Sequence, residues 1–163
     1  MDESSNGASA VSAPRSYGFF GCHTHSVDEK GRIIIPTTYR EALGDTFSIG
    51  PTRSFDGIAL YPTAVYDQIL AELSSLNQRS LNVQQYTMQF YKLSNRDMQK
   101  DGQGRILLPQ KIRQRFLENA SEVEISGSNN FIRIMDAAKA AEIEDNFNQN
   151  LPTILEQMGH SEP

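Results

Sequence analysis

The feature that most constrains the fold is a 13-residue motif that occurs twice, 73 residues apart. Residues 28–40 read DEKGRIIIPTTYR and residues 101–113 read DGQGRILLPQKIR, which share the form D-x-x-G-R-Φ-Φ-Φ-P-x-x-Φ-R, where Φ is apolar. Six of the thirteen positions are identical and the apolar positions keep one register, which indicates a tandem duplication. Two copies at this long period do not make a stacking array. The pattern therefore predicts two similar halves that share one core.

Length and composition place the chain among ordinary globular proteins. Its 163 residues are enough to bury a real core, and no apolar run approaches the length of a membrane span. No export signal is recognisable, so we expect a cytoplasmic protein. The single cysteine, Cys22, excludes an internal disulfide framework. No phosphate loop, dinucleotide fingerprint or metal cluster is recognisable, so we expect no cofactor and no small-molecule ligand.

Charge is segregated along the chain. The net charge is -5, which argues against a nucleic-acid contact over the whole surface. Residues 79–115, however, carry eight basic and two acidic side chains, a net charge of +6, whereas residues 116–163 carry two basic and nine acidic ones, a net charge of -7. A basic contact surface in the middle of the chain and simple solvated charge both remain open.

Each half has the predicted order β-β-α-β-β. In the first half we expect strands at 19–27, 33–35, 47–49 and 58–61, with residues 28–31 as a hairpin turn between the first two. A helix should begin at a capping box formed by Thr38 and Glu41 and end at Gly44. The second half should have a strand ending at Lys100, a helix at 110–117, and further strands at 106–108, 123–125 and 131–134. Spaced apolar residues predict further helices around residues 66–76, 83–90 and 140–147, whose stripes we interpret as core or subunit contacts.

The chemistry of the motif lies in its two turns. Gly31 and Gly104 supply a backbone that tolerates positive φ or close approach. Asp28 and Asp101 precede Arg32 and Arg105 by four positions, so each turn can bring carboxylate and guanidinium together as a bidentate pair. Such pairs can also be purely structural scaffolding, and spacing alone does not decide between the two roles.

The turns also carry basic side chains that lack such a partner. Lys30 has no carboxylate four residues ahead of it and should point to solvent, where an ammonium suits a phosphate. Two tips presenting Lys30 with Arg32 and Lys100 with Arg105 would form one basic surface, although Gln103 replaces Lys30 in the second copy. A two-stranded ribbon of this kind fits the major groove of DNA.

These residues, together with the stretch 19–27, resemble the MraZ family of bacterial transcriptional regulators, which is similar to AbrB-type DNA-binding proteins. The resemblance implies an α+β fold in which two tandem AbrB-like swapped-hairpin halves form a pseudo-dimeric β barrel with peripheral helices, assembled into a ring-shaped homo-oligomer. The expected segments are a disordered leader at 1–16, a first half at 17–64, a helical connector at 65–92, a second half at 93–136, and a C-terminal helix and tail at 137–163.

The resemblance also implies a function. Family members bind short direct repeats in the promoter of the division and cell-wall gene cluster that contains their own gene, which suggests a nucleoid-associated regulator, more specifically a repressor, with double-stranded DNA as its partner. By motif position, the DNA-binding residues would be Lys30, Arg32, Lys100 and Arg105. The remaining motif positions would be structural, namely Asp28, Gly31, Pro36, Arg40, Asp101, Gly104, Pro109 and Arg113.

Other features of the sequence raise three alternative functions. Cys22, His23 and His25 are close enough to suggest a metal site, but a structural site generally needs four ligands and the only other histidine is His160. An enzyme using Cys22 as nucleophile would need a partner and an oxyanion loop that the sequence does not present, so we expect no catalysis. The main alternative is an oligomeric interaction or structural protein in which the turn arginines serve assembly alone.

Overall fold

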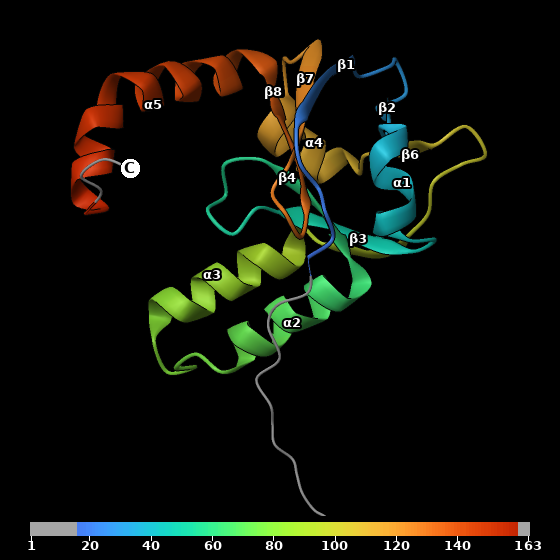
Figure 1. The fold of residues 1–163 in the computed structure, drawn as a ribbon. Coiled ribbons are helices and arrows are strands. Elements are labelled where there is room, and N and C mark those ends of the chain that lie inside the picture. The colour runs from blue at the N-terminus through green and yellow to red at the C-terminus, as the bar shows by residue number, and fades with distance from the viewer. Residues whose placement is uncertain (1–15, 160–163) are drawn as a thin grey trace, which may run out of the picture.

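The computed structural model describes residues 16–159, which form two antiparallel sheets surrounded by five helices (Figure 1). Most of the predicted leader and His160 therefore lie outside the described residues. The fold is α+β, as expected. The strands are β1 (Cys22–Ser26), β2 (Arg32–Ile34), β3 (Phe47–Pro51), β4 (Ile58–Pro62), β5 (Asn95–Met98), β6 (Arg105–Leu107), β7 (Glu122–Gly127) and β8 (Ile132–Asp136). The helices are α1 (Thr37–Leu43), α2 (Thr63–Ser74), α3 (Leu81–Lys92), α4 (Gln110–Leu117) and α5 (Ala137–Gln157).

The larger sheet is symmetric with respect to the duplication. Its six strands follow the order β1-β7-β8-β4-β3-β5, and the remaining two, β2 and β6, pair with each other. The strands β1, β3 and β4 of the first half correspond to β5, β7 and β8 of the second. If each strand is replaced by its counterpart, the same strand order results, read from the opposite edge of the sheet. The symmetry axis passes between β4 and β8, where Ala59 lies opposite Arg133.

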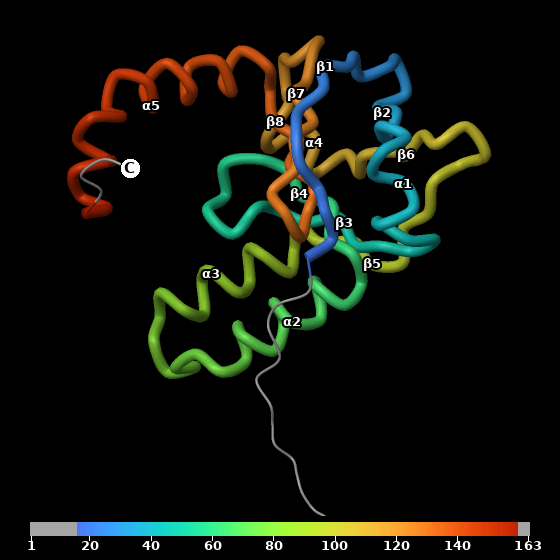
Figure 2. Tube along the Cα trace, viewed as in Figure 1, coloured from blue at the N-terminus to red at the C-terminus, as the bar shows by residue number. Residues whose placement is uncertain are grey.

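Strands cross between the halves at both edges of this sheet. The first strand, β1, pairs with β7 of the second half, and β5 pairs with β3 of the first half. The prediction that β1 and β2 pair with each other as a hairpin is therefore wrong, because β2 pairs with β6 instead. Only the connecting turn is closed, by hydrogen bonds between Asp28 and Arg32 and from Gly31 to Asp28. Figure 2 shows the chain leaving β1 and entering β2 beside the second half.

One hydrophobic core joins the two sheets. Ile33 and Ile106, opposite each other in the β2–β6 ribbon, are 1% exposed and pack into the cluster formed by the large sheet. The strands of this sheet contribute Phe47, Ile49, Ile58, Leu60, Val123, Ile125, Ile132 and Ile134. Both halves fill the same interior, as the duplicated motif predicts. A second cluster lies between α2, α3 and β4.

The helices agree with the apolar periodicity, with one local correction. Helix α4 spans 110–117 as predicted, but α1 begins at Thr37, with Pro36 at its N-cap and no side-chain cap, so the Thr38–Glu41 capping box is wrong. The fixed φ of proline already suits a helix entry. None of the helices in the described part of the chain is long and apolar enough to cross a membrane.

Each motif copy is locked to the other by an arginine that lies on a glycine. Gly31 and Gly104 have φ values of 84° and 79°, and both face an arginine from the opposite copy. A Cβ added to Gly104 would lie 2.2 Å from Cζ of Arg40, and one added to Gly31 would lie 2.7 Å from Nε of Arg113. Both reasons for glycine, positive φ and close approach, therefore apply at once.

This packing predicts the effect of adding one methyl group. Gly104→Ala should lower the free energy of unfolding by about 1–3 kcal/mol, because it combines a strained backbone with displacement of Arg40. Gly102→Ala is the matched control, since nothing lies within 4 Å of its Cβ position, and it should change stability by less than about 0.5 kcal/mol. Urea unfolding measures both, and equal midpoints for the two variants would contradict the packing argument.

Candidate nucleic-acid interface

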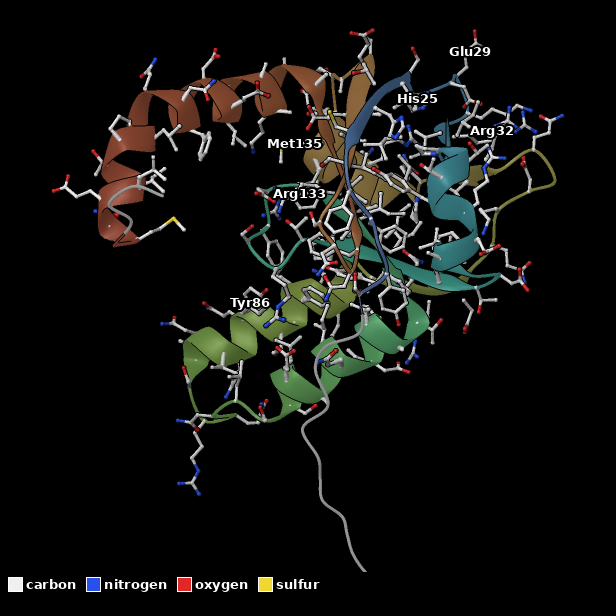
Figure 3. All side chains as sticks on the ribbon, viewed as in Figure 1. His25, Glu29, Arg32, Tyr86, Arg133 and Met135 are labelled. Atoms are coloured by element: carbon white, nitrogen blue, oxygen red, sulfur yellow. The ribbon has the colours of Figure 1, made fainter. Side chains whose placement is uncertain are left out.

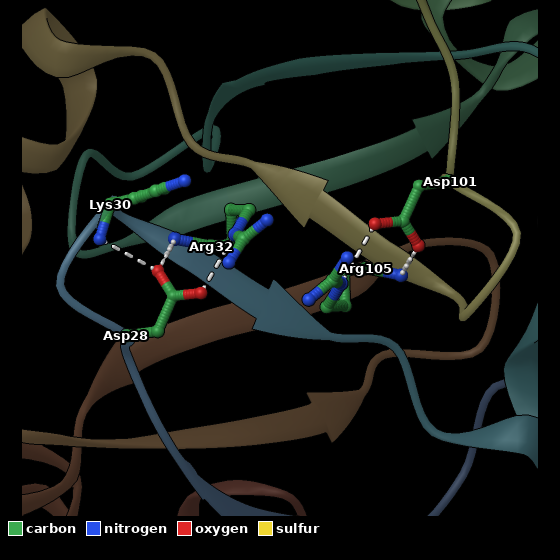
Figure 4. Close-up of polar contacts among 5 residues, drawn as sticks. All are labelled: Asp28, Lys30, Arg32, Asp101 and Arg105. Atoms are coloured by element: carbon green, nitrogen blue, oxygen red, sulfur yellow. Dashed lines mark hydrogen bonds and ion pairs between the residues drawn. The ribbon is translucent and has the colours of Figure 1, made fainter.

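The first turn, residues 28–32, is organised by the carboxylate of Asp28. Oδ1 accepts hydrogen bonds from the backbone N–H groups of Lys30 at 2.9 Å and Arg32 at 2.8 Å, and Oδ2 accepts one from Nε of Arg32 at 2.7 Å (Figure 4). One side chain therefore fixes both the turn backbone and the arginine that follows it.

The second turn, residues 101–105, repeats this arrangement. Oδ1 of Asp101 accepts from the backbone N–H groups of Gln103 and Arg105, each at 2.9 Å, and Oδ2 accepts from Nε of Arg105 at 2.7 Å. The predicted ion pairs are thus present, but the expected bidentate geometry is wrong, because backbone donors occupy the other carboxylate oxygen. Each guanidinium is held through Nε, so its terminal Nη groups are not engaged by the aspartate.

The two arginines lie on one face of the β2–β6 ribbon. Arg32 is opposite Leu107 and Arg105 is opposite Ile34, so these four side chains share the face that points away from the core. Ile34 and Leu107 are 44% and 54% exposed. We call this set the ribbon face: Arg32, Ile34, Arg105 and Leu107. It is a compact surface with two fixed cations and two apolar side chains.

The turn tips differ in charge. Lys30 is exposed and its backbone N–H, not its ammonium, is bound to Asp28. Its side chain extends away from that carboxylate (Figure 4). Within residues 16–159 no ion pair or hydrogen bond involves its ammonium. Gln103 takes the corresponding place in the second turn, so the first tip carries the extra cation.

Lys100 lies elsewhere. Its ammonium donates a 2.7 Å hydrogen bond to the carbonyl of Gly44 at the end of α1, and it lies 5.6 Å from the ring centre of Phe47. The side chain is half-buried, and burial lowers the pKa of its ammonium; the charge of Asp45 raises this pKa and that of Arg40 lowers it, both by less. The structure brings Lys30, Arg32 and Arg105 to the ribbon and its tips, and gives Lys100 a contact inside the fold.

Sequence reasoning did not identify Ile34 and Leu107 as candidate contact residues. The signal was available, because side chains alternate along a strand and the buried Ile33 therefore places Arg32 and Ile34 together on the other side.

The two histidines considered as metal ligands lie side by side on β1. His23 and His25 stack with ring centres 6.4 Å apart, and no group of three potential ligands suits a metal ion in the described portion of the chain.

Comparison with known proteins identifies the family. Residues 19–86 match the family model described as "MraZ protein, putative antitoxin-like", a segment that contains the first motif copy. The chain is also 31% identical over 141 residues to "Transcriptional regulator MraZ" of Acetivibrio thermocellus, an alignment that covers 86% of this chain and 96% of that protein. The chain belongs to the MraZ family. Two further members from Roseiflexus castenholzii and Limosilactobacillus fermentum, with the same name, are 35% and 34% identical over 71% and 78% of this chain and 79% and 87% of their own lengths. These MraZ proteins are named as regulators and not as enzymes.

The turn geometry predicts an unusually acidic aspartate. Hydrogen bonds from the Arg105 backbone and side chain and from the Gln103 backbone lower the pKa of Asp101 to about 2. Because the folded pKa lies below the ordinary value of 3.8, the stabilisation is complete above that value and is lost as the pH falls toward 2. We expect an NMR titration of the Asp101 carboxyl carbon to have its midpoint near 2, and Arg105→Gln to raise it only part of the way, since both backbone donors remain. A midpoint near 4 in the wild-type protein would contradict the turn geometry.

Proposed function

We propose that this protein is a sequence-specific DNA-binding transcriptional regulator whose ribbon face enters the major groove. The observation that carries the proposal is the pair Arg32 and Arg105, each held by an aspartate through Nε on one exposed face. Fixing Nε lowers the entropy that each arginine loses on binding and leaves the Nη groups to reach a ligand. The name shared by the family members supports the same conclusion.

The residue types on this face match the edges of DNA bases. Arginine Nη groups suit O6 and N7 of guanine, and exposed apolar side chains such as Ile34 and Leu107 suit the methyl group of thymine. Lys30 at the first tip would contact a phosphate, which positions the ribbon without reading sequence. Lys100 would act indirectly, by holding the end of α1 through Gly44.

The finer functional assignment follows from the family resemblance. We propose that the protein binds short direct repeats in the promoter of the division and cell-wall gene cluster that includes its own gene, and represses it from a cytoplasmic, nucleoid-associated position. An oligomer fits repeated sites, since several ribbons on one DNA raise the effective concentration of each.

We also propose the swapped-hairpin architecture for the two halves. The pairing of β1 with β7 and of β5 with β3 supports it, because each half gives a strand to the other. The packing of Ile33 and Ile106 of the β2–β6 ribbon into the core of the large sheet supports the proposed pseudo-dimeric barrel. Residues 17–64 and 93–136 would then be the halves, with 65–92 as connector and 137–163 as the C-terminal helix and tail.

Self-assembly is supported by an uncovered helix. Helix α5 reaches away from the sheet (Figure 1), and Ala140 is its only buried residue within the described part of the chain. Its counterpart in the first half is α2, shifted by 74 residues, so Tyr66, Ile69 and Leu73 correspond to Ala140, Ile143 and Phe147. In the first half α3 covers this stripe through Phe90.

A second copy of the chain has a surface that could cover the exposed apolar side chains of α5. Helix α3 has an outer face with Leu81, Met88 and Tyr91 exposed, whereas its inner face packs on α2. Residues 79–92 carry two basic and no acidic side chains, and α5 carries four acidic and one basic. We propose that α5 of one subunit packs on α3 of the next, a head-to-tail contact that can close into a ring.

Two substitutions test the DNA contact. Lys30→Ala combined with Arg32→Ala should weaken binding to DNA from upstream of the protein's own gene by about tenfold or more, since base and phosphate contacts are both lost. It should also reduce the dependence on salt by a log-log slope of about 0.9 for each phosphate contact removed. Fluorescence anisotropy at several salt concentrations, with scrambled DNA as competitor, measures both effects.

Lys139→Ala is a control for the loss of one positive charge, because this exposed residue lies on α5. Helix α5 extends away from the side of the molecule that carries Arg32 (Figure 3). The control variant should leave specific binding unchanged. If the double variant loses its oligomeric state together with DNA binding, or if wild type binds scrambled DNA equally well, the interaction-protein alternative is favoured instead.

A pair of substitutions on α5 tests the assembly. Ile143→Ser with Phe147→Ser should reduce the oligomer to smaller species in multi-angle light scattering, because each change removes roughly 1–3 kcal/mol of apolar burial from every subunit contact. Both residues are nearly half exposed in the single chain, so folding should be retained. Phe20→Ser, at a 65% exposed aromatic outside α5, is the control. An unchanged mass would show that α5 is not the contact.

A further inference from the structure

The ribbon face has a local twofold symmetry. In the β2–β6 ladder the pair Arg32–Leu107 lies on one side of a central pair of isoleucines, and the pair Arg105–Ile34 lies on the other side. A half-turn about the centre therefore exchanges the two arginines and puts one apolar side chain in the place of the other. By itself this face would read a base sequence almost equally well in two opposite directions.

The turn tips break this symmetry. The turns 28–32 and 101–105 lie at opposite ends of the ribbon (Figure 4), and at matching positions the first carries Lys30 and the second carries Gln103. Both side chains are exposed, and both backbone N–H groups are bound to the aspartate of their own turn at 2.9 Å. Within residues 16–159 the side-chain amide of Gln103 makes no hydrogen bond. An unpaired amide and an unpaired ammonium therefore occupy equivalent places.

The helices beside the turns add to this difference. A 3.0 Å hydrogen bond from the backbone N–H of Leu108 to the carbonyl of Gly31 ties the start of α4 to the first turn, and an equivalent bond ties the start of α1 to the second turn. Lys111 is exposed in the first turn of α4, where α1 has Thr38. The first end of the ribbon thus gains a second free cation.

The two ends of the ribbon consequently differ in charge. Residues 28–32 and 110–114 carry four basic and two acidic side chains, a net charge of +2 that includes the exposed Glu29. Residues 101–105 and 37–41 carry two basic and two acidic side chains, a net charge of 0. The first end therefore suits the phosphate backbone, whereas the neutral second end suits the edge of a base.

The chemistry of a glutamine amide selects one base in the major groove. The amide has a donor and an acceptor side by side, and adenine presents the N7 acceptor beside the N6 amino donor, so the two groups can form a bidentate pair. A lysine ammonium only donates, which suits a phosphate or the two acceptors of guanine. The exchange of Lys30 for Gln103 between the copies therefore changes which group each tip can bind.

We propose that Gln103 reads an adenine at one end of each bound site and thereby gives the site a direction, a role that rests on the proposed DNA binding of the ribbon face. Gln103 precedes Arg105 by two positions, which corresponds to about 6–7 Å along a strand, and the rise of DNA is about 3.4 Å per base pair. The adenine should therefore lie within about three base pairs of the base that Arg105 contacts. At the other end Lys30 holds a phosphate and specifies no base.

A directional site fits the proposed ring. Subunits related by rotation present their ribbons in the same sense along a bound duplex. Sites that each have a direction must then point the same way, as direct repeats do. A fully symmetric ribbon would bind inverted repeats equally well.

Modified adenine tests the contact itself. DNA from upstream of the protein's own gene would be mapped by footprinting, and each adenine of the bound repeats replaced in turn by 7-deazaadenine, which lacks the N7 acceptor, at the same place in every repeat. At one adenine per repeat, the wild-type protein should lose about threefold or more in affinity, measured by fluorescence anisotropy, and Gln103→Ala should lose nothing further. Gln89→Ala, at an exposed glutamine of α3, is the matched control and should respond as wild type does.

An exchange variant tests the direction. Lys30→Gln combined with Gln103→Lys keeps the net charge and moves the amide to the other tip. It should prefer DNA in which each repeat is replaced by its reverse complement, by about fivefold or more over the natural repeats, whereas wild type should show the opposite preference.

The outcomes separate this role from DNA binding in general. Sequence-specific binding in which wild type and Gln103→Ala respond alike to every modified adenine overturns the role of Gln103 alone. An exchange variant that keeps the wild-type direction overturns the directional role as well. Equal binding of wild type to the natural repeats and to scrambled DNA overturns the proposed DNA-binding function, and the role of Gln103 with it.

Discussion

The guanidinium groups of Arg40 and Arg113 each lie against the turn glycine of the opposite motif copy, Gly104 and Gly31. A two-stranded ribbon is marginal by itself, because it has only one ladder and one buried face. Here the helix after each ribbon strand packs on the turn that precedes the other strand, so the two copies hold each other. In both copies of the motif an arginine follows the turn glycine by nine residues, and this arginine packs on the turn glycine of the other copy.

The motif residues that make these contacts are the same in both copies, whereas several other motif residues differ between the copies. Aspartate, glycine and both arginines are identical in the two copies because they close the turns and join the halves. Several residues outside these contacts differ between the copies, among them Lys30 and Gln103 at the turn tips and Val27 and Lys100 before the aspartates. The duplication thus yields a symmetric frame with one more cation at the first tip.

Sequence periodicity was sufficient to predict the helices and strands, but not to predict which strands pair with each other. The bounds of α4 followed from apolar spacing, because spacing reports which face of an element is buried. It does not report which strand lies alongside, so the local hairpin prediction was wrong and the crossing of β1 to β7 was not derivable from it. The hydrogen bond from Lys100 to the carbonyl of Gly44 could not be predicted for a similar reason, since the two residues are far apart in the sequence.

The ribbon face also explains how an acidic protein could approach DNA. The net charge of -5 repels a duplex at long range, but beyond about 8–10 Å this repulsion is screened at physiological salt. At contact, the two arginines of one ribbon and the lysine of its first tip form only a few charge pairs, so a single subunit would bind weakly. In the proposed oligomer, repetition of the ribbon would multiply these contacts without making any chain basic. Such a protein would bind DNA tightly only where the sites are repeated, because elsewhere one ribbon engages and the rest of the acidic surface does not.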